Sequence, residues 1–532
     1  MYPAAWGVTL ALCALAAVLH ESLPPLRPAA WCLVAALAGL LALNILISAQ
    51  RLQTLRTAAP LGAALLLGIV VREATPAGGR VVVLALAALG IVAAAHGLYQ
   101  SFVEFPRLAA SPDPEWTEAV RARITSGRAV GSLGLPGALA GLLCMTLPLT
   151  AVGLTGLAGR TASGLRRAAI IVLCSLQAVA LLATQSAAAF GCAMCAAGLV
   201  CWVCRPGGRR RWAIAAALIG AGLIGAAIVL GVRIAAVTAV EGSGPFNLRA
   251  GNWLVALRVF ADHPGFGVGL GCYGVLFPQY RQWGMNESRF AHNSYLQALA
   301  EGGPLLGLLV VAAALIFGRI LLRRARRGLE PALIAAAGLS FLLHNLFDFT
   351  VYLPSLALVF AAVAGLARDP ESPPRSEGAV ASRTLVMAAA LILAAVALWI
   401  ARGDAARDAA IEEGRPERLV DAGLSAVEAN PIDPESRSIL SGALLERSLA
   451  GPDGESLAAA LRHAERACDL DPFTPHHWHQ LGRVRLAMKD PMGAWLALAR
   501  AAELYPTRIE YREQRDAVAR AIADLHQHEA QR

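Results

Sequence analysis

Two side chains in this sequence of 532 residues, Arg249 and His292, are suited to chemistry on a phosphorylated substrate. A neutral imidazole can accept a proton from a hydroxyl group at working pH. A guanidinium group binds phosphate oxygens through a rigid fork of donors. The same stretch contains four further candidates for substrate binding: Arg258, Arg289, Asn293 and Glu301. Because ionisable groups are costly beside apolar segments, this set predicts a functional site at a membrane boundary.

The residues around Arg249 and His292 indicate how these side chains are held. Arg249 and Trp253 are four positions apart, so they share one face of a helix that we expect to lie along the membrane surface. His292 precedes an apolar run, and Asn293 or Ser294 is suited to cap the helix that begins there. The positive end of that helix adds to the charge of the arginines. We expect these groups to converge on a site for an anionic lipid headgroup.

The same stretch contains the glycine-rich segment 265–271 and Glu301. We expect the glycines to allow tight turns and to expose backbone N–H groups to an anion. No β-strand precedes them, so they are poor evidence for a nucleotide-binding loop. Glu301 lies deeper in the apolar helix, where a structural hydrogen-bond partner is more common than an acid or a base.

The composition places these residues in a membrane protein. Hydrophobic residues make up 57% of the sequence and charged residues 16%, whereas a soluble domain has about a quarter of its residues charged. Long apolar runs predict about twelve transmembrane helices in an all-α, polytopic bundle. The predicted spans are 3–20, 29–49, 58–72, 80–103, 131–155, 168–185, 188–204, 212–234, 294–318, 331–347, 351–367 and 384–401.

The basic residues predict the orientation of the bundle. The net charge is +9, and arginines are concentrated in the short loops 205–211 and 319–327, which the positive-inside rule places in the cytoplasm. Alternation then puts the loop 241–291 and the C-terminal domain on the periplasmic side of a bacterial inner membrane. Arg51 and Arg56 conflict with this count, because the same rule favours the cytoplasm for them. No basic patch interleaved with aromatic residues is present, so nucleic acid is not an expected partner.

Cysteine usage predicts no metal site. Cys192-Ala-Met-Cys195 and Cys201-Trp-Val-Cys204 have the spacing of zinc ligands, but both lie in one apolar stretch without polar flanks or a nearby histidine. We interpret them as helix-packing residues and expect no metal and no cofactor.

The composition changes to that of a soluble helical domain at the predicted boundary between the segments 1–403 and 404–532. Three similar corners recur: Ala429-Asn-Pro-Ile-Asp-Pro434, Leu470-Asp-Pro-Phe-Thr-Pro475 and Leu504-Tyr-Pro506. Pro472 and Pro506 are 34 residues apart, which is the period of tetratricopeptide repeats. A generic bundle of helical hairpins is the alternative. Either arrangement suits contact with a protein partner.

The order of motifs resembles one known superfamily. Arg249-x-x-x-Trp253 is followed by His263-Pro-Gly-Phe-Gly-Val-Gly-Leu-Gly271 and then by Ala291-His-Asn-Ser-Tyr-Leu-Gln-Ala-Leu-Ala-Glu-Gly-Gly-Pro-Leu305. This order resembles the signature of the O-antigen ligase and polymerase superfamily, most specifically over 249–307 and more broadly over 80–367. Weaker similarities are Gly131-Ser-Leu-Gly-Leu-Pro, which looks like the start of a central helix, and His344-Asn-Leu-Phe-Asp348-Phe, which looks like a late His/Asp segment.

The resemblance implies a metal-independent integral-membrane glycosyltransferase. It would move a glycan from undecaprenyl diphosphate to a hydroxyl group on a glycan, lipid or protein acceptor, working at the periplasmic face among membrane lipids. His292 would activate that hydroxyl group and Arg249 would bind the donor diphosphate. Relatives often have Ser-Arg-Gly where this chain has Thr184-Gln-Ser186. The resemblance therefore requires a second donor-binding arginine from elsewhere: Arg289, Arg258 or Arg128.

The alternative is a non-catalytic scaffold or a transporter that organises envelope polysaccharide assembly through its repeat domain. The missing Ser-Arg pattern is its main support. Accumulation of the lipid-linked glycan in a deletion strain would favour the enzyme over the scaffold.

Overall fold

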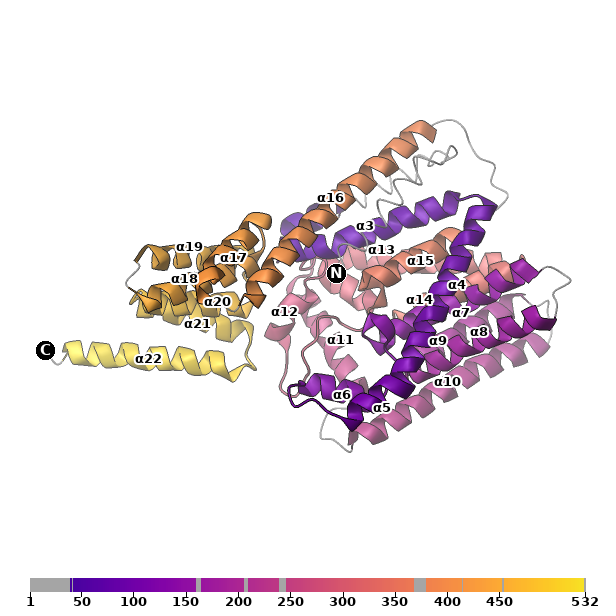
Figure 1. Cartoon of the computed structure of the whole chain (residues 1–532), viewed down its shortest axis with the longest axis horizontal. Helices are drawn as coiled ribbons and strands as arrows, with labels where there is room; N and C mark the ends of the chain where they lie inside the picture. The colour runs from indigo at the N-terminus through magenta and orange to yellow at the C-terminus, as the bar shows by residue number, and fades with distance from the viewer. Residues whose placement is uncertain are drawn as a thin grey trace.

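The computed structural model describes residues 39–40, 42–158, 164–204, 209–238, 245–367, 379–413, 415–451 and 454–530. Helices dominate these ranges, and no strand occurs among the residues described. Figure 1 shows a bundle of long helices with a smaller helical domain at one end. The prediction of an all-α, polytopic membrane protein with a helical C-terminal region is confirmed.

Ten of the twelve predicted spans coincide with apolar helices. The described residues do not include the predicted span 3–20 or most of the predicted span 29–49. Within the part of the chain that the structure describes, six helical segments are long and apolar enough to cross a membrane. They belong to α3 (Arg51–Glu73), α4 (Pro76–Tyr99, continued by η1, Gln100–Glu104, and α5, Phe105–Ala110), α7 (Pro136–Ala158), α9 (Ala187–Cys204), α13 (Ser294–Ala325) and α16 (Ala379–Glu412). The apolar segments of four others are shorter: α8 (Gly164–Ala183), α10 (Arg209–Thr238), α14 (Leu329–His344) and α15 (Pro354–Leu366).

Helix α7 lies at the centre of the bundle and packs against α4, α8, α9, α14 and α15. Its large side chains are fully buried: Leu139, Leu143, Met145 and Leu149. Gly97 of α4 lies directly against Leu139, so a side chain at this position would force the two helices apart. Small residues at helix contacts permit the close approach on which packing inside a membrane depends.

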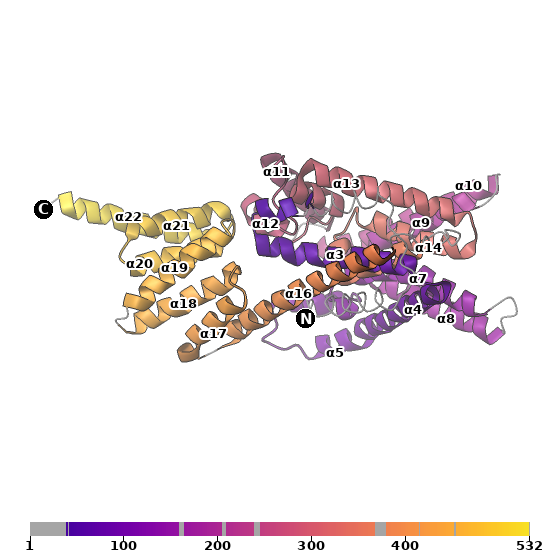
Figure 2. The ribbon, with the colours of Figure 1, turned by 90° about the horizontal axis from the view of Figure 1, so that it is seen from above.

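The helix ends that adjoin the two arginine-rich loops lie together at one end of the bundle. The sulfur of Cys204, at the end of α9, donates a hydrogen bond to the carbonyl oxygen of Ala325, at the end of α13 (3.0 Å). Arg72, at the end of α3, is close enough to interact electrostatically with Arg324. The opposite end of the bundle carries the C-terminal domain (Figures 1 and 2). Which of the two ends faces the cytoplasm stays a prediction from the positive-inside rule.

The start of α3 lies at the end of the bundle that carries the C-terminal domain. Arg56 forms an ion pair with Asp404, and its guanidinium lies 3.9 Å from Asp433. This position agrees with the alternation of the helices. Carboxylates from a distant part of the chain offset the charge of Arg56, and the side of the membrane on which Arg51 and Arg56 lie stays a prediction.

Short helices cover this end of the bundle. They are α6 (Glu118–Ser126), η2 (Gly131–Leu133), α11 (Pro245–Asp262), α12 (Tyr273–Tyr280) and η3 (Thr350–Tyr352). The predicted helix around Arg249 and Trp253 is α11. Helix α13 is broken at Gly303, whose φ of 68° and ψ of −171° are not helical, so its first turns form a separate short helix.

The C-terminal region continues from α16, which runs unbroken through the predicted domain boundary at 403. Six helices follow: α17 (Pro416–Ala429), α18 (Pro434–Ala450), α19 (Gly454–Leu470), α20 (Pro475–Ala487), α21 (Pro491–Leu504) and α22 (Ile509–Ala530). Each helix packs against the next one in sequence. The three proline corners join α17 to α18, α19 to α20 and α21 to α22. The regular helical pairing is observed, and the assignment to the tetratricopeptide class stays a prediction.

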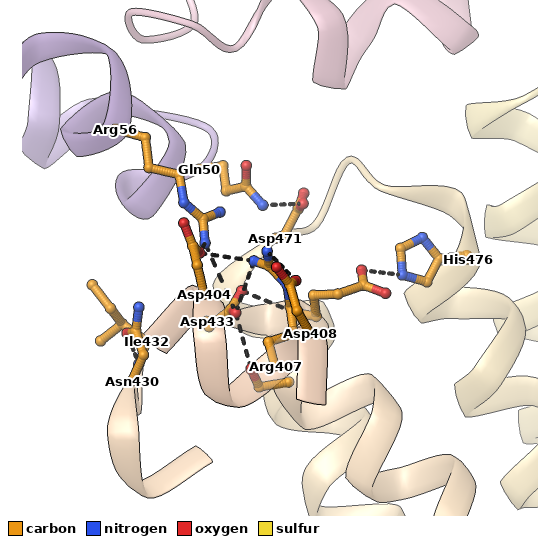
Figure 3. Close-up of polar contacts among 12 residues, drawn as sticks. Gln50, Arg56, Asp404, Arg407, Asp408, Asn430, Ile432, Asp433, Asp471 and His476 are labelled. Carbon is orange, nitrogen blue, oxygen red and sulfur yellow. Dashed lines mark hydrogen bonds and ion pairs between the residues drawn. The ribbon is translucent and has the colours of Figure 1, made fainter. Parts of the chain in front are cut away.

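All three corners contact the membrane bundle. In the first corner, Asp433 lies beside Arg56, and in the second, Asp471 accepts a hydrogen bond from Gln50 (2.8 Å), as Figure 3 shows. In the third corner, the hydroxyl group of Tyr505 accepts a hydrogen bond from Arg281 (2.7 Å) and contacts Glu287. The C-terminal domain therefore docks on the bundle through the edge that carries its three proline corners.

Candidate active site

One carboxylate lies between two histidines at the end of the bundle that carries the C-terminal domain. Oδ1 of Asp348 lies 3.6 Å from Nδ1 of His292, and Oδ2 lies 3.5 Å from Nε2 of His344. Asp348 and His344 are buried, whereas the His292 side chain is 31% exposed. His292 is therefore the member of this group that a substrate can reach.

The start of α13 fixes the position of His292. The side chain of Asn293 is the N-cap and accepts hydrogen bonds from the backbone N–H groups of Tyr295 and Leu296 (both 3.1 Å). Ser294 instead donates to Oδ1 of Asn345 (2.7 Å). His292 has a φ of 54°, a left-handed conformation that costs a non-glycine residue about 1–2 kcal/mol. Such conformations persist where surrounding contacts hold them, often at functional sites.

Aromatic rings and a glycine surround the Asp348 carboxylate. The ring of Phe349 stacks on Phe290 with centroids 4.1 Å apart, and its edge-to-face contact with the His292 ring is at 4.8 Å. Gly137, at the start of α7, lies so close to Oδ2 of Asp348 that a β-carbon at this position would collide with it. The glycine therefore makes room for the carboxylate against the central helix.

Asp348 is held in its charged form. Burial by itself raises the pKa of this carboxyl group, but the nearby His292 and His344 imidazoles and the backbone N–H of Phe349 (2.9 Å) outweigh it. The net effect lowers the pKa of Asp348 to about 2. A permanent negative charge thus faces Nδ1 of His292.

Arg249 approaches the same segment from α11. Its Nε donates a hydrogen bond to the carbonyl oxygen of Phe347 (3.2 Å). One turn later, Nε1 of Trp253 donates to the carbonyl oxygen of His292 (3.2 Å). Arg249 and His292 therefore contact adjacent residues, Phe347 and Asp348. The structure brings Arg249, His292 and the start of α13 together, as the sequence predicts.

Arg258 and Arg289 have other neighbours. The amide of Gln282 is oriented with its oxygen toward Arg258. This oxygen accepts hydrogen bonds from Nη1 (3.1 Å) and Nη2 (3.2 Å) of the arginine. Arg289 is exposed and lines a cavity of about 330 Å³ at the third corner of the C-terminal domain. The other residues that line it are Gly274, Phe277, Pro278, Glu287, Ser288 and Tyr505.

Glu301 is an anchor inside the protein. It is fully buried, and its Oε1 accepts hydrogen bonds from Nε2 of Gln297 (3.0 Å) and from the backbone N–H of Tyr273 (3.2 Å). Its backbone carbonyl accepts from Nδ2 of Asn44 (3.2 Å) and from the N–H of Gly269 (2.9 Å). These bonds hold the glycine-rich segment against α13.

The expectation that the glycine-rich segment offers its N–H groups to an anion is wrong. The N–H of Val268 bonds to the carbonyl oxygen of Ala300 (3.2 Å), and that of Leu270 bonds to Oδ1 of Asn44 (2.8 Å). Gly267 has a φ of 69°, and a β-carbon there would collide with the backbone of Glu301. The glycines allow close packing on α13 and α3 rather than on a ligand.

Arg128 lies at the turn where relatives carry an additional arginine. Its Nε donates a hydrogen bond to the carbonyl oxygen of Thr184 (2.9 Å), and the N–H of Ala129 donates to the carbonyl oxygen of Ala183 (3.0 Å). Gln185 has a φ of 50°, which marks a tight turn. Of the three arginines offered as replacements, Arg128 is the one with a contact at this turn.

Two cysteines at helix contacts of the bundle, Cys204 on α9 and Cys144 on α7, bond to backbone carbonyl groups. Sγ of Cys204 bonds to Ala325, as noted above, and Sγ of Cys144 on α7 bonds to the carbonyl oxygen of Ala189 on α9 (3.5 Å). Within the described ranges, no group of three or more potential metal ligands includes a cysteine.

Comparison with known proteins gives one match. Residues 170–311 match the family model described as O-antigen ligase. This match supports the resemblance to the O-antigen ligase and polymerase superfamily. The match covers α8 to α12 and the start of α13, and thus all six site residues selected from the sequence. The O-antigen ligase match is narrower than the range 80–367, and it leaves Asp348, His344 and Arg128 outside. A comparison with curated proteins gave no match.

Proposed function

We propose that the O-antigen ligase domain transfers a glycan from undecaprenyl diphosphate to an acceptor hydroxyl group, with His292 as the general base and Arg249 as a ligand of the donor diphosphate. The observation that carries this proposal is a pair of contacts: Arg249 bonds to the carbonyl oxygen of Phe347, and His292 faces the neighbouring Asp348. Through these contacts a partly exposed imidazole and a guanidinium lie at one surface. The match to the O-antigen ligase family supports the class of reaction.

The chemistry follows from the orientation of the imidazole. Nδ1 of His292 faces the Asp348 carboxylate, which favours a proton on Nδ1 and leaves Nε2 free to accept one. The acceptor oxygen forms a bond to the anomeric carbon of the donor while Nε2 takes the hydroxyl proton. The bond from that carbon to the phosphate oxygen breaks, and the electron pair leaves with the diphosphate. Arg249 stabilises the charge that develops there, and Arg128 is the proposed second donor-binding cation.

The remaining candidates have supporting roles in this proposal. Asn293 caps the helix that positions His292. Glu301 anchors the glycine-rich segment. Arg289 and Arg258 are proposed to contact the sugar part of a substrate. Since the arginine-rich loops lie at the opposite end, the positive-inside rule puts the site at the periplasmic face of the inner membrane. The C-terminal domain would then also be periplasmic, where its helical repeats can bind a protein partner.

The test is transfer from a lipid-linked glycan by the full chain in proteoliposomes. We expect His292→Ala to lower kcat by about 100-fold or more, because a general base contributes roughly 10²–10⁴. Arg249→Ala should lower kcat/KM for the donor by a similar factor. His526→Ala and Arg123→Ala are matched controls at exposed positions far from this contact. Full activity in both site variants contradicts the proposal, and a wild-type chain that is inert toward the donor favours the scaffold.

A further inference from the structure

Two histidines and a glutamate come together where the C-terminal domain docks on the bundle. Glu435 lies in the first turn of α18, and His476 and His477 lie in the first turn of α20. One potential ligand atom from each residue lies within 4.8 Å of the other two. Nε2 of His476 is 2.8 Å from Oε2 of Glu435, and Figure 3 shows His476 facing this carboxylate. The two helices follow the first and second proline corners, so the cluster joins two repeats.

His477 is buried, and its ring does not make all the hydrogen bonds that it could. His477 is 1% exposed, and its Nδ1 has no hydrogen-bond partner among the described residues. Its Nε2 lies 3.8 Å from Oδ2 of Asp471. An imidazole nitrogen that has no hydrogen-bond partner is able to bind a metal ion.

We propose that Glu435, His476 and His477 bind one divalent transition-metal ion, and that zinc fits this ligand set best. Zinc takes imidazole nitrogen and carboxylate oxygen at about 2.0–2.2 Å, usually in tetrahedral geometry. Such bonds place the ligand atoms roughly 3.3–3.5 Å apart. In the structure Nε2 of His476 and Oε2 of Glu435 are 2.8 Å apart, and all three ligand atoms lie within 4.8 Å of one another, so small side-chain rotations reach these separations. Calcium and magnesium prefer ligand sets made of oxygen alone.

The residue behind His477 supports this assignment. Histidines that bind metals usually donate their second N–H to a carboxylate, which fixes the ring. Asp471 is buried and occupies that position beside Nε2 of His477. Its Oδ2 also accepts hydrogen bonds from Thr474 (2.6 Å) and from Gln50 of the bundle (2.8 Å). The metal would therefore be connected to the bundle through His477, Asp471 and Gln50.

This connection gives the metal a structural role at the domain junction. Glu435 lies two residues after Asp433, which contacts Arg56. A metal bound to Glu435 and His477 would fix the first two corners relative to each other and to the start of α3. The inference concerns the junction and does not depend on the proposed transfer reaction.

Metal content of the purified full chain tests the proposal. After treatment with a chelator, equilibration with zinc and removal of free metal, we expect one zinc ion per wild-type chain. Glu435→Gln and His476→Ala should each retain less than about a tenth of that amount. Both positions are partly exposed, so these variants should fold even if His477→Ala does not. His479→Ala is the matched control, because this ring contacts Gln514 instead. Equal zinc in wild type and both variants overturns the proposal, as does a wild type that retains none.

Cobalt distinguishes this site from the cysteines. Wild-type protein loaded with cobalt should show d–d absorption bands without a charge-transfer band from sulfur, because the ligands are nitrogen and oxygen. These bands should disappear in Glu435→Gln. Asp471→Asn should weaken cobalt and zinc binding by about 10–100-fold, as expected for a residue that orients a ligand. A sulfur-to-cobalt band that persists in Glu435→Gln would place the metal at cysteines and contradict the proposal.

Discussion

The carboxylate of Asp348 faces Nδ1 of His292 at 3.6 Å, and this contact distinguishes His292 from an ordinary surface histidine. A carboxylate at Nδ1 fixes the tautomer of the ring and stabilises the imidazolium that forms when Nε2 takes a proton. His344 contacts the other oxygen of Asp348 from the buried side. Asp348 is therefore a positioning residue for the proposed base rather than a group that touches the substrate.

Replacement of Asp348 by asparagine should reduce transfer strongly. The amide cannot favour the required tautomer of His292, so we expect kcat to fall by about 10²–10⁴ with little change in KM for the donor. The measurement is steady-state transfer by the full chain in proteoliposomes. Asp113→Asn, at an exposed position, is the matched control. A kcat within twofold of wild type would show that Asp348 does not act through His292.

Asp348 should also make stability depend on pH in the acid range. Its pKa is about 2 in the folded protein against an ordinary value of 3.8. A lowered pKa stabilises the folded state above the ordinary value, and this stabilisation is lost as the pH falls through the folded value. The difference corresponds to about 2 kcal/mol.

Unfolding by denaturant in detergent measures this effect. We expect wild type to be more stable than Asp348→Asn at pH 5 and the difference to shrink between about pH 4 and pH 2. A constant difference across that range contradicts the assignment. Because Asp348 stays ionised from pH 5 upward, a change of transfer rate between about pH 5 and 8 must come from another group.

Arg128 should be required for use of the donor. If it replaces the arginine that relatives carry near Thr184, Arg128→Ala should lower kcat/KM for the donor by about 100-fold, as expected for loss of a guanidinium bonded to phosphate. Arg128→Lys keeps the charge but loses the fork of donors, so it should recover only part of the activity. Arg123→Ala, on exposed α6, is the control. Equal activity of Arg128→Ala and the control would exclude this role.

Much of the fold follows from local sequence. Apolar length located ten apolar helices in the described part of the chain, six of which are long enough to cross a membrane. The prolines located the three corners of the C-terminal domain. Both signals are local in the sequence. The convergence of Arg249 and His292 was also predicted. Asp348 was noted only through a resemblance, although a signal was present. His344 and Asp348 are ionisable residues four positions apart at the end of an apolar run, and such residues are functional candidates by default.

The remaining features depend on contacts between distant segments. The N–H groups of Val268 and Gly269 bond to α13, and that of Leu270 bonds to Asn44. No local pattern shows that a glycine-rich segment packs against protein instead of ligand. Arg56 is neutralised by Asp404, which lies 348 positions later in the chain. A rule based on loop charge cannot anticipate that pairing.

The packing role of the glycine-rich segment predicts a difference between two neighbouring glycines. Gly267 has a φ of 69° and lies directly against Glu301, so Gly267→Ala should cost about 2 kcal/mol or more through strain and displacement of α13. A β-carbon at Gly265 meets no atom within 4 Å, so Gly265→Ala should change stability by less than about 1 kcal/mol. Thermal unfolding in detergent compares the two. Similar losses in both variants would contradict the close packing of Gly267 on α13.

The ion pair between Arg56 and Asp404 should stabilise docking of the C-terminal domain. Arg56→Asp places a negative charge beside Asp404 and the buried Asp433, so we expect faster release of the domain in limited proteolysis. Asp404→Arg on that background restores an opposite pair, and a double-mutant cycle should give a coupling energy of about 1 kcal/mol. Arg51→Asp is the matched control, because Arg51 is exposed at the start of the same helix. If the effects of the two substitutions were purely additive, the ion pair would not govern the junction. Repulsion among the remaining charges would then govern it.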